Sequence, residues 1–241
     1  MKRAVVLCSG GLDSVVTANY LKKRLDYKEM IILFFNYGQR AVWQEKKAAK
    51  KCALNLNAKF CEIKISEIKN LSHSLINRGG EISWILRGEL SNTKKESDKW
   101  YVPCRNIIFL SYALSLAESI YLKCKKVFDI AVGFKNEGND GFPDTSWEFV
   151  NKFNEVGEIA CKKKFRIIAP LIKKDKEDIV LLGKNMGVKM GDTYSCYVGI
   201  KNKNEHCGYC LACRLRQEGF YWANVEDITK YRKKMKDFRR A

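Results

Sequence analysis

The first residues able to do chemistry form a glycine- and serine-rich stretch, Ser9-Gly10-Gly11-Leu12-Asp13-Ser14, directly after an apolar run. Glycine lets a backbone approach a phosphate closely and adopt positive φ. A following helix, which we expect to start near Asp13, offers free N–H groups that attract an anion. The hydroxyls of Ser9 and Ser14 can add hydrogen bonds. The stretch therefore predicts a phosphate cradle, and because no lysine follows the glycines it is not a Walker A loop.

A second set of chemically capable residues stands near the end of the chain. Four cysteines follow the spacing C-x10-C-x2-C-x2-C: Cys196, Cys207, Cys210 and Cys213. Four thiolates fill a tetrahedral zinc site and leave no open position, so the predicted role is structural. The adjacent His206 is a fallback ligand that four cysteines make unnecessary. An iron–sulfur cluster also takes four cysteines and a redox pair takes two, so both stay as alternatives to the favoured zinc.

The elements that must position these residues alternate along the chain. Short apolar runs predict strands, and longer amphipathic stretches between them predict helices. The expected strands are 4–8, 30–35, 59–65, 127–132 and 166–168, and the expected helices are 14–24, 42–54, 107–122 and 147–162. The pattern predicts an α/β fold with a doubly wound parallel sheet of about five strands. Ligands bind such sheets beyond the carboxyl ends of the strands.

Two regions depart from this alternation. Residues 66–100 are polar, which predicts an insertion with a short helix and a mobile loop that could act as a lid, a contact surface or a plain loop. The last stretch, KYRKKMKDFRR, predicts a basic helix or a frayed tail. We therefore expect one domain over 1–190, which carries the insertion, and a helical, zinc-binding C-terminal region over 191–241.

Composition limits the classes of function. The 241 residues carry a net charge of +18, which suggests polyanionic partners. The lysines are scattered, however, so solvated faces explain the charge more simply. No stretch approaches the roughly 20 apolar residues of a membrane span, and no signal peptide is evident. With two histidines and ten cysteines, we expect a cytoplasmic protein without Ser-His-Asp catalysis, whose clustered cysteines bind metal.

Placed after the first strand, the string SGGxDS resembles the pyrophosphate loop of the N-type ATP pyrophosphatases. These enzymes cleave ATP between its α- and β-phosphates and adenylate a substrate. The resemblance implies an adenine nucleotide alpha hydrolase-like fold, with an ATP pyrophosphatase domain over 1–190. The implied ATP-binding residues are Cys8, Ser9, Gly10, Gly11, Leu12, Asp13, Ser14 and Val15. Asp13 would cap the helix or help to hold Mg²⁺ beside the phosphates.

Together, the loop and the four cysteines resemble the 7-cyano-7-deazaguanine synthase family. The matching segments run in order along most of the chain: SGGLDS, NYGQR (36–40), VPCRN (102–106), GFPD (141–144), EFV (148–150), PL with Lys176, TYSCYVG (193–199) and CGYCLACRLR (207–216). The family converts 7-carboxy-7-deazaguanine to the nitrile with ATP and ammonia, for queuosine and archaeosine synthesis. The resemblance thus implies a carbon–nitrogen ligase that uses ATP, Mg²⁺ and Zn²⁺.

The resemblance also implies roles by position. Asp13, Arg105 and Lys176 would be catalytic, since the two cations suit a phosphate or the substrate carboxylate. The implied substrate-binding residues are Tyr37, Gln39, Arg40, Asn106, Phe142 and Asp144. Asn106 and Asp144 can hydrogen-bond a purine-like edge, although Asp144 suits a helix N-cap nearly as well. No side chain is an obvious nucleophile, so catalysis would rest on orientation and charge stabilisation.

Several positions depart from the family pattern, in segments expected to face the deazaguanine: Ala41, Cys104, Gly138 and Thr145. Cys104 stands where the family has a glycine, so it adds bulk there. A second hypothesis follows, in which the enzyme activates the same acid but stops at the amide, or transfers the acyl group to another amine on a protein or nucleic acid.

Two further hypotheses and one possible partner remain. A tRNA-modifying ATP pyrophosphatase is favoured by the basic charge, although no RNA-binding domain is appended. A zinc-containing nucleic-acid-binding module without enzymatic activity is disfavoured by the intact loop. The insertion or the charged tail could also form a homodimer contact.

Overall fold

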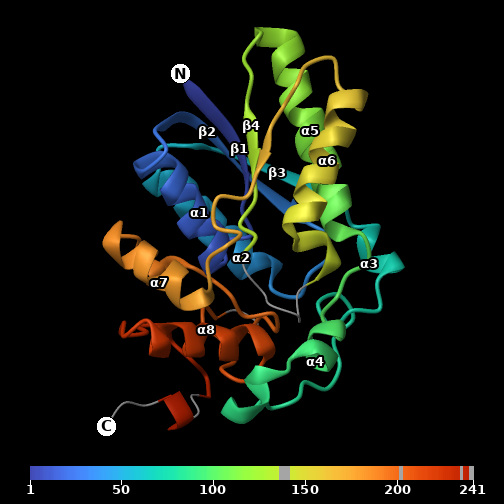
Figure 1. Cartoon of the computed structure of the whole chain (residues 1–241). Helices are drawn as coiled ribbons and strands as arrows, with labels where there is room; N and C mark the ends of the chain where they lie inside the picture. Colours follow the sequence, from blue (N-terminus) through green and yellow to red (C-terminus); the bar gives the residue numbers. More distant parts are fainter. Residues whose placement is uncertain (136–141, 201–202, 234–235, 239–241) are drawn as a thin grey trace.

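Five strands pair into one parallel sheet in the order β3-β2-β1-β4-β5 (Figure 1). The computed structural model describes residues 1–135, 142–200, 203–233 and 236–238. The strands are β1 (Lys2–Leu7), β2 (Tyr27–Asn36), β3 (Lys59–Lys64), β4 (Asp129–Ala131) and β5 (Ile167–Ile168). Every predicted strand is present, so the predicted α/β class with a parallel sheet is confirmed.

Helices cover both faces of the sheet. α1 (Leu12–Lys23), α2 (Val42–Asn55) and α7 (Lys176–Asn185) pack on one face, and α5 (Arg105–Cys124) and α6 (Trp147–Ala160) pack on the other (Figure 1). The sequence predicted four of these helices within a few residues and missed α7. Two covered faces explain why the central strands are continuous apolar runs.

Alternate residues of β1 enter the two cores. Ala4 and Val6 belong to the core under α1, α2 and α7, whereas Val5 belongs to the core under α5 and α6. All three are fully buried. Burying an aliphatic side chain such as valine contributes about 1.5–3 kcal/mol, so β1 anchors the fold from both sides.

The helix α5 is long and apolar enough to cross a membrane by length and composition alone. The expectation that no stretch approaches the length and hydropathy of a membrane span was therefore wrong for α5. Leu110, Ala113 and Ala117 are fully buried along its inner face, and α5 contacts β1 and β4. It is thus a helix of the α/β core.

The C-terminal region is built on α8 (Leu211–Trp222), in agreement with the expected helical character, although the sequence did not give the bounds of this helix. Its inner face carries Arg214 and Arg216, whose side chains are 0% and 1% exposed. Arg214 Nε donates to the backbone oxygen of Ile85 (2.8 Å), and Arg216 Nη1 donates to Thr193 Oγ1 (2.8 Å). These buried bonds tie α8 to the insertion and to the chain that precedes the cysteines.

The insertion itself forms short elements: α3 (Ile68–Leu71), the 3-10 turn η1 (Arg87–Ser91) and α4 (Lys94–Asp98). It packs on the C-terminal region, where the ring of Trp84 stacks on Tyr209 with centroids 4.8 Å apart. Further 3-10 turns within the described residues are η3 (Pro143–Thr145), η4 (Met190–Asp192) and η5 (Lys236–Phe238). Of the expected basic helix or frayed tail, only part lies within the described residues, and that part forms an isolated bridge between Tyr231 and His206 and the turn η5.

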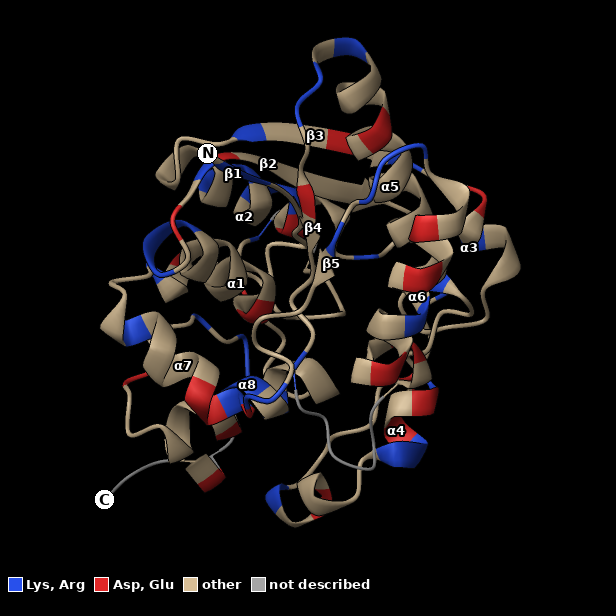
Figure 2. Ribbon diagram, turned by 45° about the horizontal axis from the view of Figure 1, so that its top comes forward, with Lys and Arg blue, Asp and Glu red and all other residues tan. Residues whose placement is uncertain are grey.

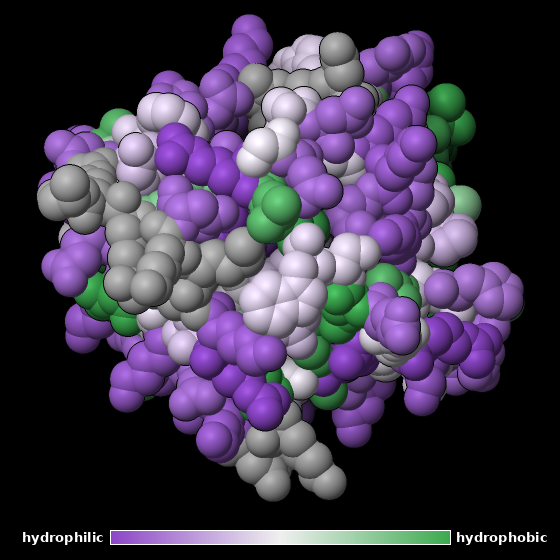
Figure 3. Space-filling model, turned by 90° about the horizontal axis from the view of Figure 1, so that it is seen from below, coloured by the Kyte–Doolittle hydropathy of each residue, from purple (hydrophilic) through white to green (hydrophobic). Residues whose placement is uncertain are grey.

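The basic residues are spread over many elements. Lys and Arg occur on α4, α7, α8 and the strands, with acidic residues among them (Figure 2). Seen from below, on the side of α8 and α4, hydrophilic side chains surround a small central group of apolar ones (Figure 3). The basic residues behind the net charge of +18 are thus distributed over several elements in Figure 2.

The strand order changes direction between β1 and β4, because the chain leaves β1 toward β2 on one side and returns to β4 on the other. Ligands bind open α/β sheets at this switch point. Gly133, just after β4, allows close contact with the start of α1, since an added Cβ would lie 2.8 Å from Ser14 Cα. The carboxyl ends of the strands point toward α8 (Figure 1).

Candidate active site

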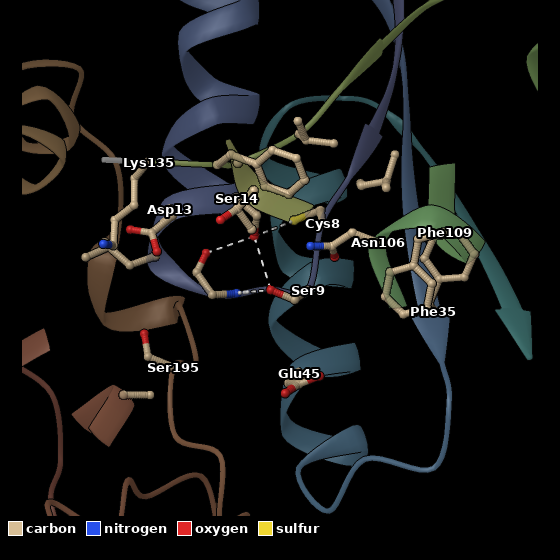
Figure 4. A pocket seen from close by; sticks show the side chains of 18 of the residues that line it. Cys8, Ser9, Asp13, Ser14, Phe35, Glu45, Asn106, Phe109, Lys135 and Ser195 are labelled. Atoms are coloured by element: carbon tan, nitrogen blue, oxygen red, sulfur yellow. Dashed lines mark hydrogen bonds between the residues drawn. The ribbon is translucent and has the colours of Figure 1, made fainter. Parts of the chain in front are cut away.

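A cavity of about 270 Å³ opens at the switch point, between the carboxyl ends of the strands and α8. Its walls come from the loop after β1, the segment after β4, the start of α5 and the chain around Ser195 (Figure 4). The predicted residues that it brings together are Cys8, Ser9, Gly11, Leu12, Asp13, Ser14, Tyr37, Gln39, Arg105, Asn106, Phe142 and Lys176. Four predicted residues, Gly10, Val15, Arg40 and Asp144, are outside its described lining.

The loop after β1 has the geometry of an anion cradle. Gly10 has φ +82° and packs so closely on α2 that an added Cβ would lie 2.5 Å from the backbone oxygen of Glu45. Gly11 is the N-cap of α1, and no side chain caps this helix. Its first N–H groups are therefore available to an anion. Asp13 sits in the first turn of α1, so the expectation that it caps the helix is wrong.

Asp13 and Lys176 meet in the cavity. Lys176 Nζ donates to both carboxylate oxygens of Asp13, at 2.6 and 2.7 Å. The lysine begins α7, and its side chain packs on α8 so closely that an added Cβ on Gly219 would lie 2.2 Å from Lys176 Cγ. Contact between the two helices thus holds this cation beside the loop.

Arg105, the first residue of α5, lies among Tyr37, Tyr197 and Asp144. Burial works to lower the pKa of its guanidinium, but these neighbouring oxygens outweigh burial and raise that pKa. Burial raises the pKa of Tyr37 to about 12, so its hydroxyl stays neutral near pH 7. The cavity therefore holds a fixed positive charge suited to a carboxylate or a phosphate.

Asp144 lies outside the cavity lining and bonds to Asn106, which is part of it. Its Oδ2 accepts from Asn106 N (3.3 Å), and its backbone oxygen accepts from Asn106 Nδ2 (3.2 Å). The N-cap of α6 is Ser146, whose Oγ accepts from Phe149 N (3.0 Å). Asp144 is therefore not that cap, and it orients Asn106 instead.

Arg40 and Gln39 are neighbours with different surroundings. Arg40 lies beside the insertion: its Cζ would be 3.7 Å from a Cβ added to Gly79, and its N–H donates to the oxygen of Ile76 (2.9 Å). Gln39 is 3% exposed and its Oε1 accepts from Tyr37 N (2.9 Å). The structure thus places Gln39 at the cavity and Arg40 against the insertion.

The four cysteines converge on one point. All are buried, and their sulfurs lie within 4.8 Å of one another. The sulfurs of Cys207 and Cys213 are 3.8 Å apart. A tetrahedron with Zn–S bonds of about 2.3 Å has edges of about 3.8 Å. Backbone N–H groups of Cys207 and Cys210 donate to the sulfurs of Cys196 and Cys207 (3.3 Å each), which suits thiolate ligands. The set fits a structural zinc ion.

His206 connects the cysteine region to the cavity. Its Nε2 accepts from Ser195 N (3.0 Å), and the four cysteines form the ligand group without it, as expected. Burial, helped by the charge of Arg216, lowers its pKa to about 3 and keeps the ring neutral. Next to it, Tyr194 N donates to the oxygen of Gly10 (2.8 Å). The cysteine region is therefore bonded directly to the loop after β1.

The sequence model of the family described as "Queuosine biosynthesis protein QueC" matches residues 3–224, which include both the loop and the four cysteines. The chain belongs to the QueC family. Proteins named 7-cyano-7-deazaguanine synthase from Methanosphaera stadtmanae and Nitratiruptor are 37% and 36% identical to it. Each match covers 99% of the relative, and 96% and 95% of this chain, respectively.

A solved structure, the NMN synthetase from Francisella tularensis, aligns with a TM-score of 0.42 and 15% sequence identity. The alignment covers 94% of this chain and 78% of that one.

Three of the four departures from the QueC pattern can be located. Cys104 is exposed and has φ +55°, a left-handed conformation that favours glycine. Ala41 is 1% exposed, and Thr145 lines the cavity with its Oγ1 donating to the oxygen of Phe142 (2.8 Å). Gly138 lies outside the described residues. None of these three positions lies in the loop Ser9–Ser14, which therefore keeps the family pattern.

Sequence reasoning missed several residues that line the cavity of this QueC protein: Phe35, Glu45, Phe109, Lys135, Ser195 and Tyr197. The rings of Phe35 and Phe109 stack at 4.1 Å between centroids and form an apolar wall. Glu45 lies in the first turn of α2. A signal was present for both, since Phe35 lies at the carboxyl end of a correctly predicted strand and Glu45 lies in the first turn of the correctly predicted helix that follows it.

Proposed function

We propose that this chain is a 7-cyano-7-deazaguanine synthase, which adenylates 7-carboxy-7-deazaguanine and converts it with ammonia to the nitrile. One observation carries the proposal: a single cavity combines an anion-binding loop, a half-buried cation and an aromatic wall. Full-length relatives with this name support it. The product would enter queuosine and other 7-deazapurine synthesis.

The loop side of the cavity would bind ATP. The open N–H groups at the start of α1, with Ser9 and Ser14, would hold the departing pyrophosphate. Lys176 would exchange its contact with Asp13 for a phosphate oxygen. Asp13 would then be free to hold Mg²⁺, which prefers carboxylate and phosphate ligands.

The opposite side would bind the acid. Phe35 and Phe109 offer a flat apolar surface to a deazaguanine ring, and Asn106 can hydrogen-bond its edge. Arg105 would attract the carboxylate and stabilise charge as the acyl phosphate forms. Adenylation turns a poor electrophile into one with AMP as leaving group, and ammonia then gives the amide. A second activation of the amide oxygen allows dehydration to the nitrile.

We also propose that residues 1–190 form the catalytic domain and that residues 191–241 form its zinc-binding support. The four cysteines would hold zinc and keep the chain around Ser195 against the phosphate loop. The cytosol is the expected location, because thiol ligands stay reduced there.

A second candidate is favoured by Cys104, which replaces the family's glycine directly before Arg105 and Asn106. In that candidate the activated acyl group stops at the amide or passes to another amine, on a protein or a nucleic acid. It uses the same adenylation step and differs in the acceptor.

One experiment tests both candidates. Purified protein is incubated with ATP, 7-carboxy-7-deazaguanine and ammonium, and the products are weighed by mass spectrometry. Nitrile as the main product, with AMP release, supports the synthase. Amide alone, or a conjugate formed when a protein or RNA is added, supports the second candidate, and absence of AMP overturns both.

A further inference from the structure

Glu45 is a carboxylate of the cavity to which the steps above give no role (Figure 4). Its position is fixed, because Gln39 Nε2 donates to Glu45 Oε2 (2.9 Å). Gln39 is in turn held by the N–H of Tyr37 and the backbone oxygen of Phe35, at 2.9 Å each. The orientation of the carboxylate is therefore set by a buried hydrogen-bond chain that starts at the end of β2.

The second oxygen of Glu45 is available to a ligand. Among the described residues, no hydrogen-bond donor is recorded for Oε1. The backbone of Glu45 packs against Gly10 of the phosphate loop, and Figure 4 shows its carboxylate on the same side of the cavity as Ser9. A free carboxylate oxygen thus faces the space next to the loop, where an acyl phosphate would form.

The surroundings of Glu45 suit proton exchange. Burial raises its pKa from 4.5 to about 7. The hydrogen bond from Gln39 and the charge of Arg105 on α5 act to lower it, and Cys196 in the C-terminal region acts to raise it. A carboxyl group that titrates near the working pH is well matched to general acid–base catalysis.

The proposed reaction needs a proton acceptor in this place. An ammonium ion has no lone pair, so it must lose a proton before its nitrogen can attack the acyl carbon. We propose that Glu45 accepts this proton and delivers ammonia to the acyl adenylate. The inference rests on the proposed function and adds the group that activates the nitrogen donor.

An N–H bond of ammonium breaks, its proton passes to Glu45 Oε1, and the electron pair stays on nitrogen. That pair forms the C–N bond, while the C–O bond to AMP breaks and its electrons leave with the phosphate. A second proton moves from nitrogen to that phosphate, giving the amide and AMP. Glu45 then releases its proton to water.

The variant Glu45→Gln tests the proposal, because its amide oxygen can still accept from Gln39. With ammonium as donor, amide and nitrile formation should fall by about 10²–10⁴-fold. Adenylation without a nitrogen donor, followed by pyrophosphate release, should stay within a few-fold of wild type. Hydroxylamine is largely unprotonated at neutral pH and needs no such base, so hydroxamate formation should match that of wild type.

The pH dependence gives an independent readout. Below about pH 7 the carboxyl of Glu45 is protonated and cannot accept a proton. The ratio of wild-type to Glu45→Gln rates with ammonium should therefore be large above pH 7 and approach one as the pH falls. Taking the ratio cancels the ionisation of ammonium itself. A ratio that does not change with pH would contradict the proposal.

Two more variants complete the test. Glu155→Gln makes the same change on the exposed face of α6, so the rates with ammonium and with hydroxylamine should both equal those of wild type. Glu45→Asp keeps a carboxylate one methylene away, so only the ammonium rate should fall, by roughly tenfold to a hundredfold. Glu45→Asp replaces Glu45→Gln as the test variant if the Glu45→Gln protein does not fold.

Equal losses with ammonium and hydroxylamine, or no loss with ammonium, overturn the role of Glu45. If wild type forms no AMP from the acid, the proposed function fails instead.

Discussion

At the scale of single residues, Cys104 has a backbone conformation that opposes folding. Its φ of +55° and ψ of 16° are left-handed, and α5 begins at the next residue with Arg105. A residue with a Cβ loses about 1 kcal/mol or more in this conformation. The turn is nevertheless required, because it sets where Arg105 and Asn106 enter the cavity. Local strain is thus located next to the residues that would bind the acid.

The substitution Cys104→Gly should remove this strain. We expect the free energy of unfolding to rise by about 1 kcal/mol, measured by urea denaturation at equilibrium. Cys104→Ala is the matched control, since it removes the thiol and keeps the Cβ. An equal gain from both variants would show that the thiol, and not the backbone conformation, limits stability.

The residue scale also shows where sequence reasoning ends. The loop Ser9–Ser14 follows β1 and lines the cavity, and it could be singled out from sequence because its neighbours in sequence create its chemistry. Arg40 and Glu45 are five residues apart, yet only Glu45 reaches the cavity, since Arg40 lies against Gly79 of the insertion. The direction of such a side chain depends on a distant segment. Residue type predicted the chemistry, and tertiary packing decided which residue supplies it.

At the scale of elements, strands and core helices followed from apolar periodicity, whereas α8 did not. The inner face of α8 is partly made of buried arginines, Arg214 and Arg216, which a hydropathy pattern assigns to the surface. They are buried because their guanidinium groups donate to Ile85 O, Thr193 Oγ1 and Ser195 Oγ. An element that buries charge through bonds to distant segments leaves little periodic signal.

The packing of α7 on α8 yields a prediction about catalysis. In Gly219→Ala the added Cβ would lie only 2.2 Å from Lys176 Cγ. This contact is too short, so Lys176 must move. Moving this cation should lower AMP formation by roughly tenfold to a hundredfold. Alanine favours a helix over glycine by about 1 kcal/mol, so helix propensity does not explain the loss. The measurement is the initial rate of AMP release at saturating acid.

A second buried helical glycine provides the control. A Cβ on Gly157 of α6 would lie 3.5 Å from Leu114, an ordinary van der Waals contact. Gly157→Ala should therefore keep the wild-type rate of AMP release. A Gly219→Ala enzyme that is as active as Gly157→Ala would show that α7 adjusts without displacing Lys176.

At the scale of the whole molecule, the cysteine region joins segments that are far apart in sequence. Tyr194 N bonds to Gly10 O in the phosphate loop, two residues before the ligand Cys196. Arg214, next to the ligand Cys213, bonds to Ile85 O in the insertion. The cluster therefore stands between the loop, the insertion and α8. A metal ion there would stabilise the floor of the cavity as well as its own ligands.

Removing the metal should consequently affect the loop after β1, which would bind ATP. We expect one zinc ion per chain by elemental analysis, and a strong chelator should remove it and lower the melting temperature. Limited proteolysis should then cut within residues 66–100, because α8 no longer holds Ile85. AMP formation should be lost together with zinc and return when zinc is restored, since the cluster positions Tyr194 against Gly10.

The variants Cys210→Ser and Cys124→Ser separate this effect from general thiol chemistry. Cys210 is a buried member of the cluster, whereas Cys124 is exposed at the end of α5. Cys210→Ser should lose zinc, become sensitive to proteolysis within residues 66–100 and lose AMP formation. Cys124→Ser should keep all three properties of the wild type. If the Cys210→Ser protein lost zinc but kept the wild-type rate of AMP release, the cluster would stabilise only its own region. The contact between Tyr194 and Gly10 would then form without the metal.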